Sequence, residues 1–139
     1  MAHIVAIGAG QAGSSLVAKL RNSGFDGKVT LIGAERHPPY QRPPLSKKYL
    51  LGEMSEERLY LKPASFYNEH KIALITGTPV TAIDPAAREV VAGDGRIPYD
   101  CLALTTCALP RLLPAAVGGA LAGVYPVRTR ADVDAMATE

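Results

Sequence analysis

The chain has 139 residues, and a chain of this length forms one domain that buries about two-thirds of its surface on folding. Its formal net charge is +2, and apart from Lys47-Lys48 the basic residues are scattered, which gives no reason to expect a nucleic acid or an anionic membrane as a partner. No apolar run reaches about 18 residues, and no basic region precedes the apolar run near the N-terminus. We therefore expect neither a transmembrane helix nor a signal peptide, and we expect a cytoplasmic location.

The first motif along the chain is the apolar run His3 to Ile7, which opens onto three glycines in GxGxxG spacing. Gly8 allows a tight turn out of a buried strand, Gly10 allows the backbone to approach a pyrophosphate, and Gly13 allows the next helix to pack on the sheet. The anion then binds unpaired N–H groups at the helix N-terminus. An ordinary glycine-rich turn is the alternative. The candidate pyrophosphate contacts are Gly8, Gly10, Gln11, Ala12 and Gly13.

The residues that follow favour a dinucleotide site. Apolar residues recur at helical spacing through residues 11–22, and Ser23-Gly24 is a stop signal. Lys28 to Ile32 is a β-branched run that predicts a second strand, and Glu35 lies about 20 residues past the last glycine, where a carboxylate accepts hydrogen bonds from a ribose hydroxyl. An acid there would repel a 2′-phosphate. NAD and FAD both remain candidates at this point.

The segment from Pro39 to Leu50 carries the motif Arg42-Pro43-Pro44-Leu45-Ser46-Lys47. Two prolines predict an extended stretch, and Ser46 is placed as the N-cap of a short helix that carries Lys47. A proline-rich surface loop is the alternative. Together with the N-terminal motif, however, this loop resembles the FAD domain of the FAD-dependent ferredoxin, rubredoxin and putidaredoxin reductases, within the pyridine nucleotide-disulfide oxidoreductase superfamily. The resemblance implies that Arg42 and Lys47 contact FAD and that Lys47 places a cation near the flavin.

The resemblance extends over essentially the whole chain. It implies a helix over 64–71, a third parallel strand at Ile72 to Ile75 and an adenine contact at Val80. Turn signals at Asp84-Pro85 and Asp94-Gly95 predict a small antiparallel meander over about residues 79–99. The expected fold is therefore α/β: a Rossmann-like FAD-binding domain with a parallel sheet and an inserted antiparallel meander, and it is incomplete.

Two later segments resemble motifs of the same family. Thr105-Thr106-Cys107 stands where the family carries Ala-Thr-Gly, and a glycine at a strand end commonly serves a positive φ or a close backbone approach. We expect Cys107 to cost conformational energy or to hold the cofactor slightly away, and the resemblance makes Thr106 and Cys107 part of the cofactor shell. In Val127-Arg128-Thr129 it makes Arg128 an FAD contact, and residues 131–139 begin a connecting helix.

The cysteines and histidines predict no metal site and no disulfide. Cys101 and Cys107 are six residues apart, which is about 20 Å in an extended strand, and Cys101 is expected to be a small buried hydrophobic residue. His3, His37 and His70 lack metal-ligand spacing. No cysteine precedes Cys101, so a redox dithiol beside the flavin is absent and electrons would leave for an external acceptor.

The resemblance implies a FAD-binding domain over residues 1–111, then a loop, a short strand and the start of the connecting helix over 112–139. The family's NAD(P)H domain and C-terminal domain are expected to be absent. The implied function is electron transfer from NAD(P)H through FAD to a ferredoxin- or rubredoxin-type iron-sulfur protein, with no side chain acting as catalytic acid, base or nucleophile. These residues alone would be inactive, and an open sheet edge would favour oligomers. The alternatives are a stand-alone FAD- or NAD-binding module, or a truncation without turnover.

Overall fold

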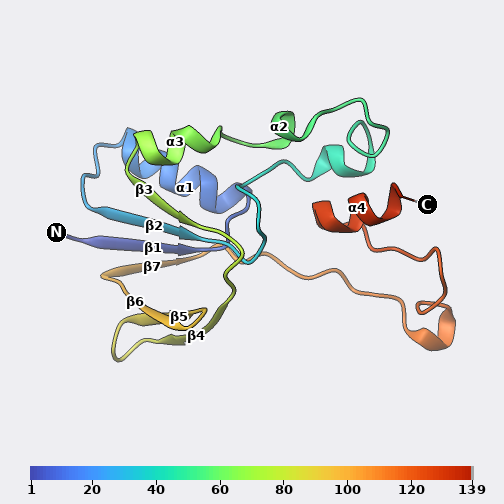
Figure 1. Cartoon of the computed structure of the whole chain (residues 1–139). Coiled ribbons are helices and arrows are strands. Elements are labelled where there is room, and N and C mark those ends of the chain that lie inside the picture. Colours follow the sequence, from blue (N-terminus) through green and yellow to red (C-terminus); the bar gives the residue numbers. More distant parts are fainter. Residues whose placement is uncertain (139) are drawn as a thin grey trace. The chain divides into compact units, whose positions relative to one another are not determined.

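The structure, a computed structural model, describes residues 1–138 and divides into two compact units (Figure 1). The first unit combines Met1–Tyr40 with Tyr60–Cys107. The second combines Gln41–Leu59 with the residues from Ala108 onward. Each unit therefore contains segments that are far apart in the sequence. The last residue of the expected connecting helix, Glu139, lies outside the described residues.

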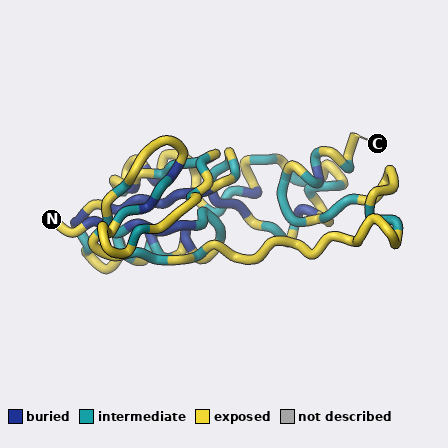
Figure 2. Tube along the Cα trace, turned by 90° about the horizontal axis from the view of Figure 1, so that it is seen from below, coloured by how far each residue is buried: buried dark blue, intermediate teal, exposed yellow. Residues whose placement is uncertain are grey.

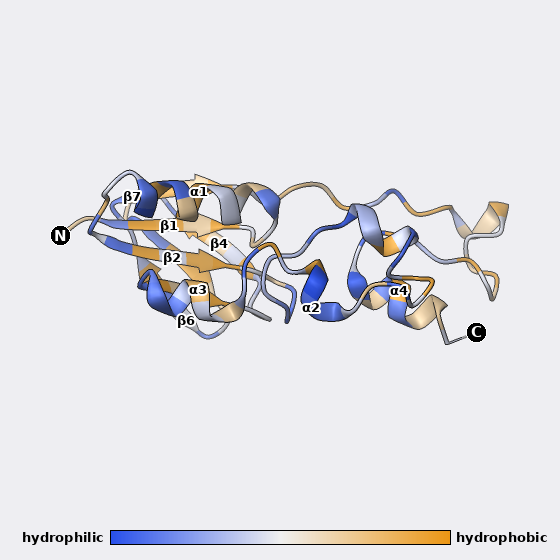
Figure 3. Ribbon diagram, turned by 90° about the horizontal axis from the view of Figure 1, so that it is seen from above, coloured by the Kyte–Doolittle hydropathy of each residue, from blue (hydrophilic) through white to orange (hydrophobic). Residues whose placement is uncertain are grey.

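The first unit is built on a four-stranded parallel sheet in the order β3-β2-β1-β7. The strands are β1 (His3–Ile7), β2 (Lys28–Ile32), β3 (Ile72–Ile75) and β7 (Cys101–Leu104). Helices α1 (Gln11–Asn22) and α3 (Ala64–Glu69) precede β2 and β3 along the chain. Parallel strands covered on both faces are apolar runs, and Figure 3 shows β1 and β2 as hydrophobic along most of their length. The predicted parallel α/β sheet is confirmed.

Consecutive residues of β1 are buried in different layers of the first unit. Ala6 belongs to a buried cluster with Val17 of α1 and Tyr67 of α3, whereas Val5 belongs to a second cluster with Val90 of the meander. This is the two-residue period of a strand, with a covering layer on each face. Figure 1 shows α1 and α3 on one side of the sheet and the meander on the other, and the tube in Figure 2 is dark blue along the strands between them.

The predicted antiparallel meander is also confirmed. It consists of β4 (Val80–Asp84), β5 (Glu89–Ala92) and β6 (Gly95–Pro98), paired in that order. The Asp84 carboxylate accepts hydrogen bonds from the N–H groups of Ala86 and Ala87 at 3.1 and 2.9 Å, which closes the first turn. The sequence signal at Asp84-Pro85 therefore acts through a side-chain hydrogen bond to the local backbone.

The second unit consists of short helical turns. They are the 3-10 helix η1 (Pro43–Ser46), α2 (Glu56–Leu59), the 3-10 helix η2 (Ala115–Val117) and α4 (Arg130–Met136). Leu45 of η1, Leu59 of α2 and Val133 of α4 are fully buried. In contrast, large apolar side chains in the segment before α4 are exposed: Leu109, Leu112, Leu113, Val117 and Leu121. Helix α4 lies where the sequence predicts the start of a connecting helix, and its connecting role stays a prediction.

Three local expectations are wrong. Pro43 and Pro44 occupy the first positions of η1, because the fixed φ of proline suits the first turn of a helix, and Ser46 ends this helix instead of capping the next one. The expected short strand is absent from residues 112–138, where prolines and glycines interrupt the backbone. Cys101 is exposed, not buried, because it begins β7, a strand at the sheet edge.

Candidate functional site

The turn between β1 and α1 gives each glycine of the motif a separate structural role. Gly8 has a φ of +108°, and a Cβ atom there would lie 2.2 Å from the carbonyl oxygen of Thr105. A Cβ atom at Gly13 would lie 2.2 Å from the carbonyl oxygen of Gly8. At Gly10, no described atom lies within 4 Å of the Cβ position apart from the glycine and its immediate neighbours along the chain. Contacts within the protein therefore explain Gly8 and Gly13, whereas the open approach at Gly10 fits a bound group that touches the backbone.

The N-terminus of α1 meets the requirements for binding an anion. Gly10 is its N-cap residue and supplies no side-chain hydrogen bond, and the first turn holds no acidic residue. Gln11 and Ala12 are exposed. The first N–H groups of a helix lack intrahelical partners, and the helix dipole adds partial positive charge at the same end. This arrangement can hold a phosphate group.

The end of β7 supports this turn. The Thr105 side-chain oxygen lies 2.9 Å from the carbonyl oxygens of both Ile7 and Gly8. Its backbone N–H also donates to the carbonyl oxygen of Ile7, at 2.8 Å. Sequence reasoning treated Thr105 only as a departure from alanine. Thr105 lies next to the glycine turn only in the fold, 97 positions from Gly8 in the sequence, so no local sequence signal identifies it as a support for the turn.

Thr106 and Cys107 follow and are exposed. Cys107 has a φ of +59°, which is the first of the two features, a positive φ or a close backbone approach, that a glycine at a strand end commonly serves. The left-handed region costs an ordinary side chain roughly 1 kcal/mol or more.

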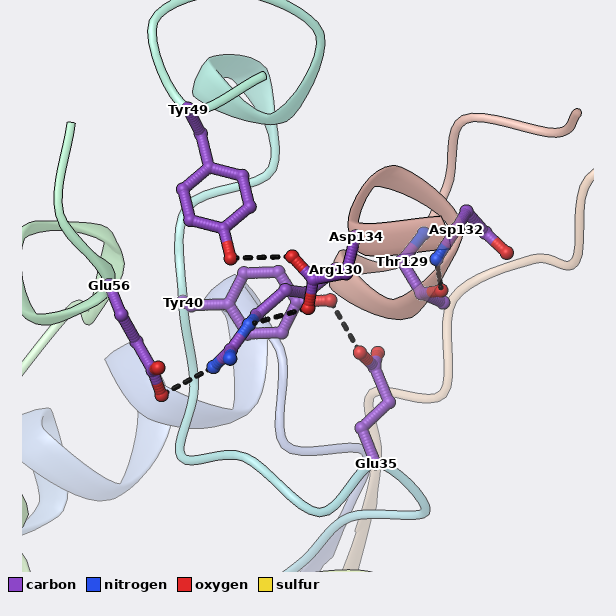
Figure 4. A network of polar contacts seen from close by, with 8 residues as sticks. All are labelled: Glu35, Tyr40, Tyr49, Glu56, Thr129, Arg130, Asp132 and Asp134. Carbon is purple, nitrogen blue, oxygen red and sulfur yellow. Dashed lines mark hydrogen bonds and ion pairs between the residues drawn. The ribbon is translucent and has the colours of Figure 1, made fainter. Parts of the chain in front are cut away.

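Glu35 lies beyond the end of β2, in the loop that leads to Tyr40. Its side chain is half-buried and accepts a hydrogen bond from the Tyr40 hydroxyl (Figure 4). Its carbonyl oxygen accepts from the N–H of Gly77, 2.8 Å away, past the end of β3. A carboxylate has about four lone-pair positions, so Glu35 can accept from a ribose hydroxyl while it remains bound to Tyr40.

Val80 begins β4 and packs against the buried cluster that contains Val90 and Ile32. It is half-buried. Packing accounts for part of this side chain, and its expected contact with adenine stays a prediction.

In the second unit, the structure brings two of the predicted site residues together. Arg42 donates from Nη1 to the carbonyl oxygen of Arg128 at 2.5 Å, across 86 positions of sequence. The third predicted residue, Lys47, directly follows η1 and is exposed.

A polar network also joins α4 to the segment that holds η1 and α2 (Figure 4). Arg130 forms ion pairs with Glu56 and, at 3.1 Å, with Asp134, and the Tyr49 hydroxyl donates to Asp134 at 2.7 Å. Burial opposes the charge of Arg130, but the bond to Glu56 and the neighbouring groups still raise the pKa of its guanidinium. Burial and the bond to Asp134 raise the pKa of Tyr49. Sequence reasoning missed this network because its members are scattered along the chain.

The described residues, 1–138, contain neither a candidate metal site nor a helix that could span a membrane. No group of three or more His, Cys, Asp or Glu side chains in this range could hold a metal ion. No helix in it is both long enough and apolar enough to cross a membrane.

The fold and the glycine turn define an α/β domain of the Rossmann type. The chain belongs to the pyridine nucleotide-disulphide oxidoreductase family, whose model matches residues 2–139. The resemblance inferred from the sequence motifs is thereby confirmed.

Among characterised relatives, the chain is 44% identical over 137 residues to a ferredoxin–NAD(P)(+) reductase of a Sphingomonas species, covering 98% of this chain and 33% of the relative. It is 46% identical to rhodocoxin reductase of Rhodococcus erythropolis, covering 96% and 31%. Its fold is similar to the crystal structure of the covalent putidaredoxin reductase–putidaredoxin complex, with a TM-score of 0.90, 37% identity and coverage of 99% of this chain and 34% of that one. The chain thus spans about a third of the length of these relatives.

Proposed function

We propose that these residues are the FAD-binding part of a flavoprotein oxidoreductase that passes electrons from NAD(P)H through FAD to a ferredoxin- or rubredoxin-type iron-sulfur protein. The observation that carries the proposal is the glycine turn, where Gly10 leaves the backbone open beside an uncapped helix N-terminus. The relatives named as ferredoxin and rhodocoxin reductases support the direction of electron flow. The putidaredoxin complex supports an iron-sulfur partner.

Each predicted site residue has a proposed role in holding the cofactor. The turn and the start of α1 hold the pyrophosphate, Glu35 holds a ribose hydroxyl and Val80 contacts the adenine. The proposed contacts toward the flavin are Arg42, Lys47, Thr106, Cys107 and Arg128. When bound, FAD would be the group that can accept a hydride and release electrons one at a time. The chain's own residues bind and orient it, and none of them needs to exchange a proton.

Absorption spectroscopy tests the binding step directly. We expect the purified chain to show a flavin band near ~450 nm and to release FAD on denaturation. A chain that takes up NAD but no FAD would contradict the proposal and favour an NAD-binding domain with a vestigial flavin loop.

A binding module without turnover is the second candidate, because the chain spans only 31% and 33% of the two reductases. We propose that these residues alone bind FAD and do not turn over. Anaerobic NADH should then leave the ~450 nm band in place. Bleaching by NADH would contradict the inactivity of this chain and support catalysis by it.

The proposal includes self-association. Strands β3 and β7 form the two edges of the parallel sheet, and unpaired edges favour pairing with other chains. Sedimentation should show oligomers whose population falls when FAD is added. A monomer with and without FAD would contradict this part. The expected cytoplasmic location stays a prediction.

A further inference from the structure

Within the second unit, both backbone polar groups of Arg128, its N–H and its carbonyl oxygen, are hydrogen-bonded. Its N–H donates to Asp132 Oδ2 at 3.0 Å, and its carbonyl oxygen accepts from Arg42 at 2.5 Å. The N–H of Thr129 donates to the same Asp132 oxygen at 2.6 Å. Two consecutive N–H groups thus converge on one carboxylate oxygen, and the backbone that carries the Arg128 side chain is fixed on both sides.

Part of this arrangement is a helix cap. The Thr129 hydroxyl accepts from the N–H of Asp132 at 3.2 Å, and together with the bond from the Thr129 N–H this is a capping box at the start of α4. A capping box requires only those two bonds. Two further bonds lie outside the helix. The N–H of Arg128 donates to Asp132, and Arg42 donates to the carbonyl oxygen of Arg128.

The charge of Asp132 suits this role. Burial alone would favour its neutral form, but the hydrogen bonds from Thr129 and Arg128 and the charge of Arg42 lower the pKa of its carboxyl group. Hydrogen bonds to a charged acceptor are stronger than neutral ones. The carboxylate therefore holds the Arg128 peptide throughout the neutral range.

We propose that Asp132 is a positioning residue, which fixes the backbone at Arg128 together with Arg42 and so aims the Arg128 side chain at the flavin. This inference rests on the proposed function, because it needs Arg128 to contact FAD. Asp132 itself touches no cofactor in the proposal. The inferred effect on binding is the one that passes through Arg128.

Asp134 provides the matched control. It lies on the same helix and carries the same charge, but its oxygens bind Tyr49 and Arg130, not the Arg128 peptide. Asp132→Ala and Asp134→Ala therefore change net charge and helix composition equally. Thr129→Ala is a second control, because it removes the hydroxyl half of the cap and leaves the carboxylate in place.

The test measures FAD affinity by flavin fluorescence and amide hydrogen exchange in the absence of FAD. We expect Asp132→Ala to weaken FAD binding about tenfold and Asp134→Ala and Thr129→Ala less than about threefold. Exchange at the amides of Arg128 and Thr129 should accelerate only in Asp132→Ala. In the Arg128→Met background, Asp132→Ala should weaken binding no further, because the two residues act in series.

Equal losses in Asp132→Ala and Asp134→Ala would overturn the inference, and so would a further tenfold loss in the Arg128→Met background. Unchanged exchange at both amides would also overturn it, whether or not FAD binds. Failure of the unmodified chain to bind FAD would instead overturn the proposed function. The two failures are therefore distinguishable.

Discussion

The parallel-sheet unit and the second unit are ordered by different kinds of contact. In the first, apolar side chains such as Val5, Val17 and Leu31 are fully buried in layers on both faces of the sheet. In the second, few apolar side chains are buried, and the long connections between segments are made by Arg42, Arg130 and their partners. Apolar burial contributes about 1.5–3 kcal/mol for each large side chain, whereas a polar contact contributes about 1 kcal/mol net. We infer that the second unit opens more easily than the first.

The largest expected effect is on the first unit, through Gly13. Gly13→Ala places a Cβ atom 2.2 Å from the Gly8 carbonyl oxygen, so α1 must move off the sheet. We expect a loss of about 3 kcal/mol in the free energy of unfolding. Chemical denaturation measures it.

Gly10→Ala is the matched substitution, because no described atom beyond the immediate chain neighbours lies within 4 Å of that Cβ position. It should change stability by less than about 1 kcal/mol and weaken FAD binding at least about tenfold. Equal stability losses in Gly10→Ala and Gly13→Ala would show that the turn is only a structural feature.

The next effect is on the second unit, through Arg130. Arg130→Met leaves Glu56 and Asp134 without their common cation in a site where the Arg130 side chain is only 16% exposed. We expect a loss of about 2 kcal/mol, seen as faster proteolysis and faster amide exchange within residues 41–59 and 130–136. Arg96→Met is the control, because Arg96 is 60% exposed in its pair with Glu89 and should cost less than about 1 kcal/mol. Similar losses of stability in both variants would contradict the inference that polar contacts hold the segments of the second unit together.

A smaller change in stability, an increase instead of a loss, is expected at Cys107, after which the chain enters the second unit. Cys107→Gly relieves a side chain at φ +59° and should raise the free energy of unfolding by about 1 kcal/mol, with tighter FAD binding. Cys101→Gly, in strand β7, should instead lower stability. Calorimetry on both variants checks the pair, and a stability loss in Cys107→Gly would show that the thiol makes contacts that outweigh the strain.

The two units also differ in how far the sequence predicted them. The parallel strands, the meander and the start of α1 follow from periodicity, glycine spacing and turn residues, which act over short distances along the chain. Thr105 supports the glycine turn across 98 positions of sequence, and Arg42 binds the carbonyl of Arg128 across 86. No local pattern encodes such pairs. The family resemblance identified Arg42 and Arg128 as site residues, but their mutual bond and the role of Asp132 required the structure.

The smallest expected effect is a difference between the two units in how their stability depends on pH. His3 is buried in β1 with Nε2 2.8 Å from the Thr30 hydroxyl oxygen, and burial, aided by the charge of Lys28, lowers the pKa of His3 below its usual 6.5. Its contribution to stability is therefore present above pH 6.5 and is lost as the pH falls through the folded-state value. The pKa of Asp132 is lowered from 3.8, so the contribution of that carboxylate is fully present above pH 3.8 and is lost only below it.

Between about pH 7.5 and about pH 5.5, amide protection should therefore fall in the first unit and stay constant in the second. His3→Gln, which can still bond to Thr30, should remove the pH dependence of the first unit. A pH response that persists in this variant would place the titrating group elsewhere.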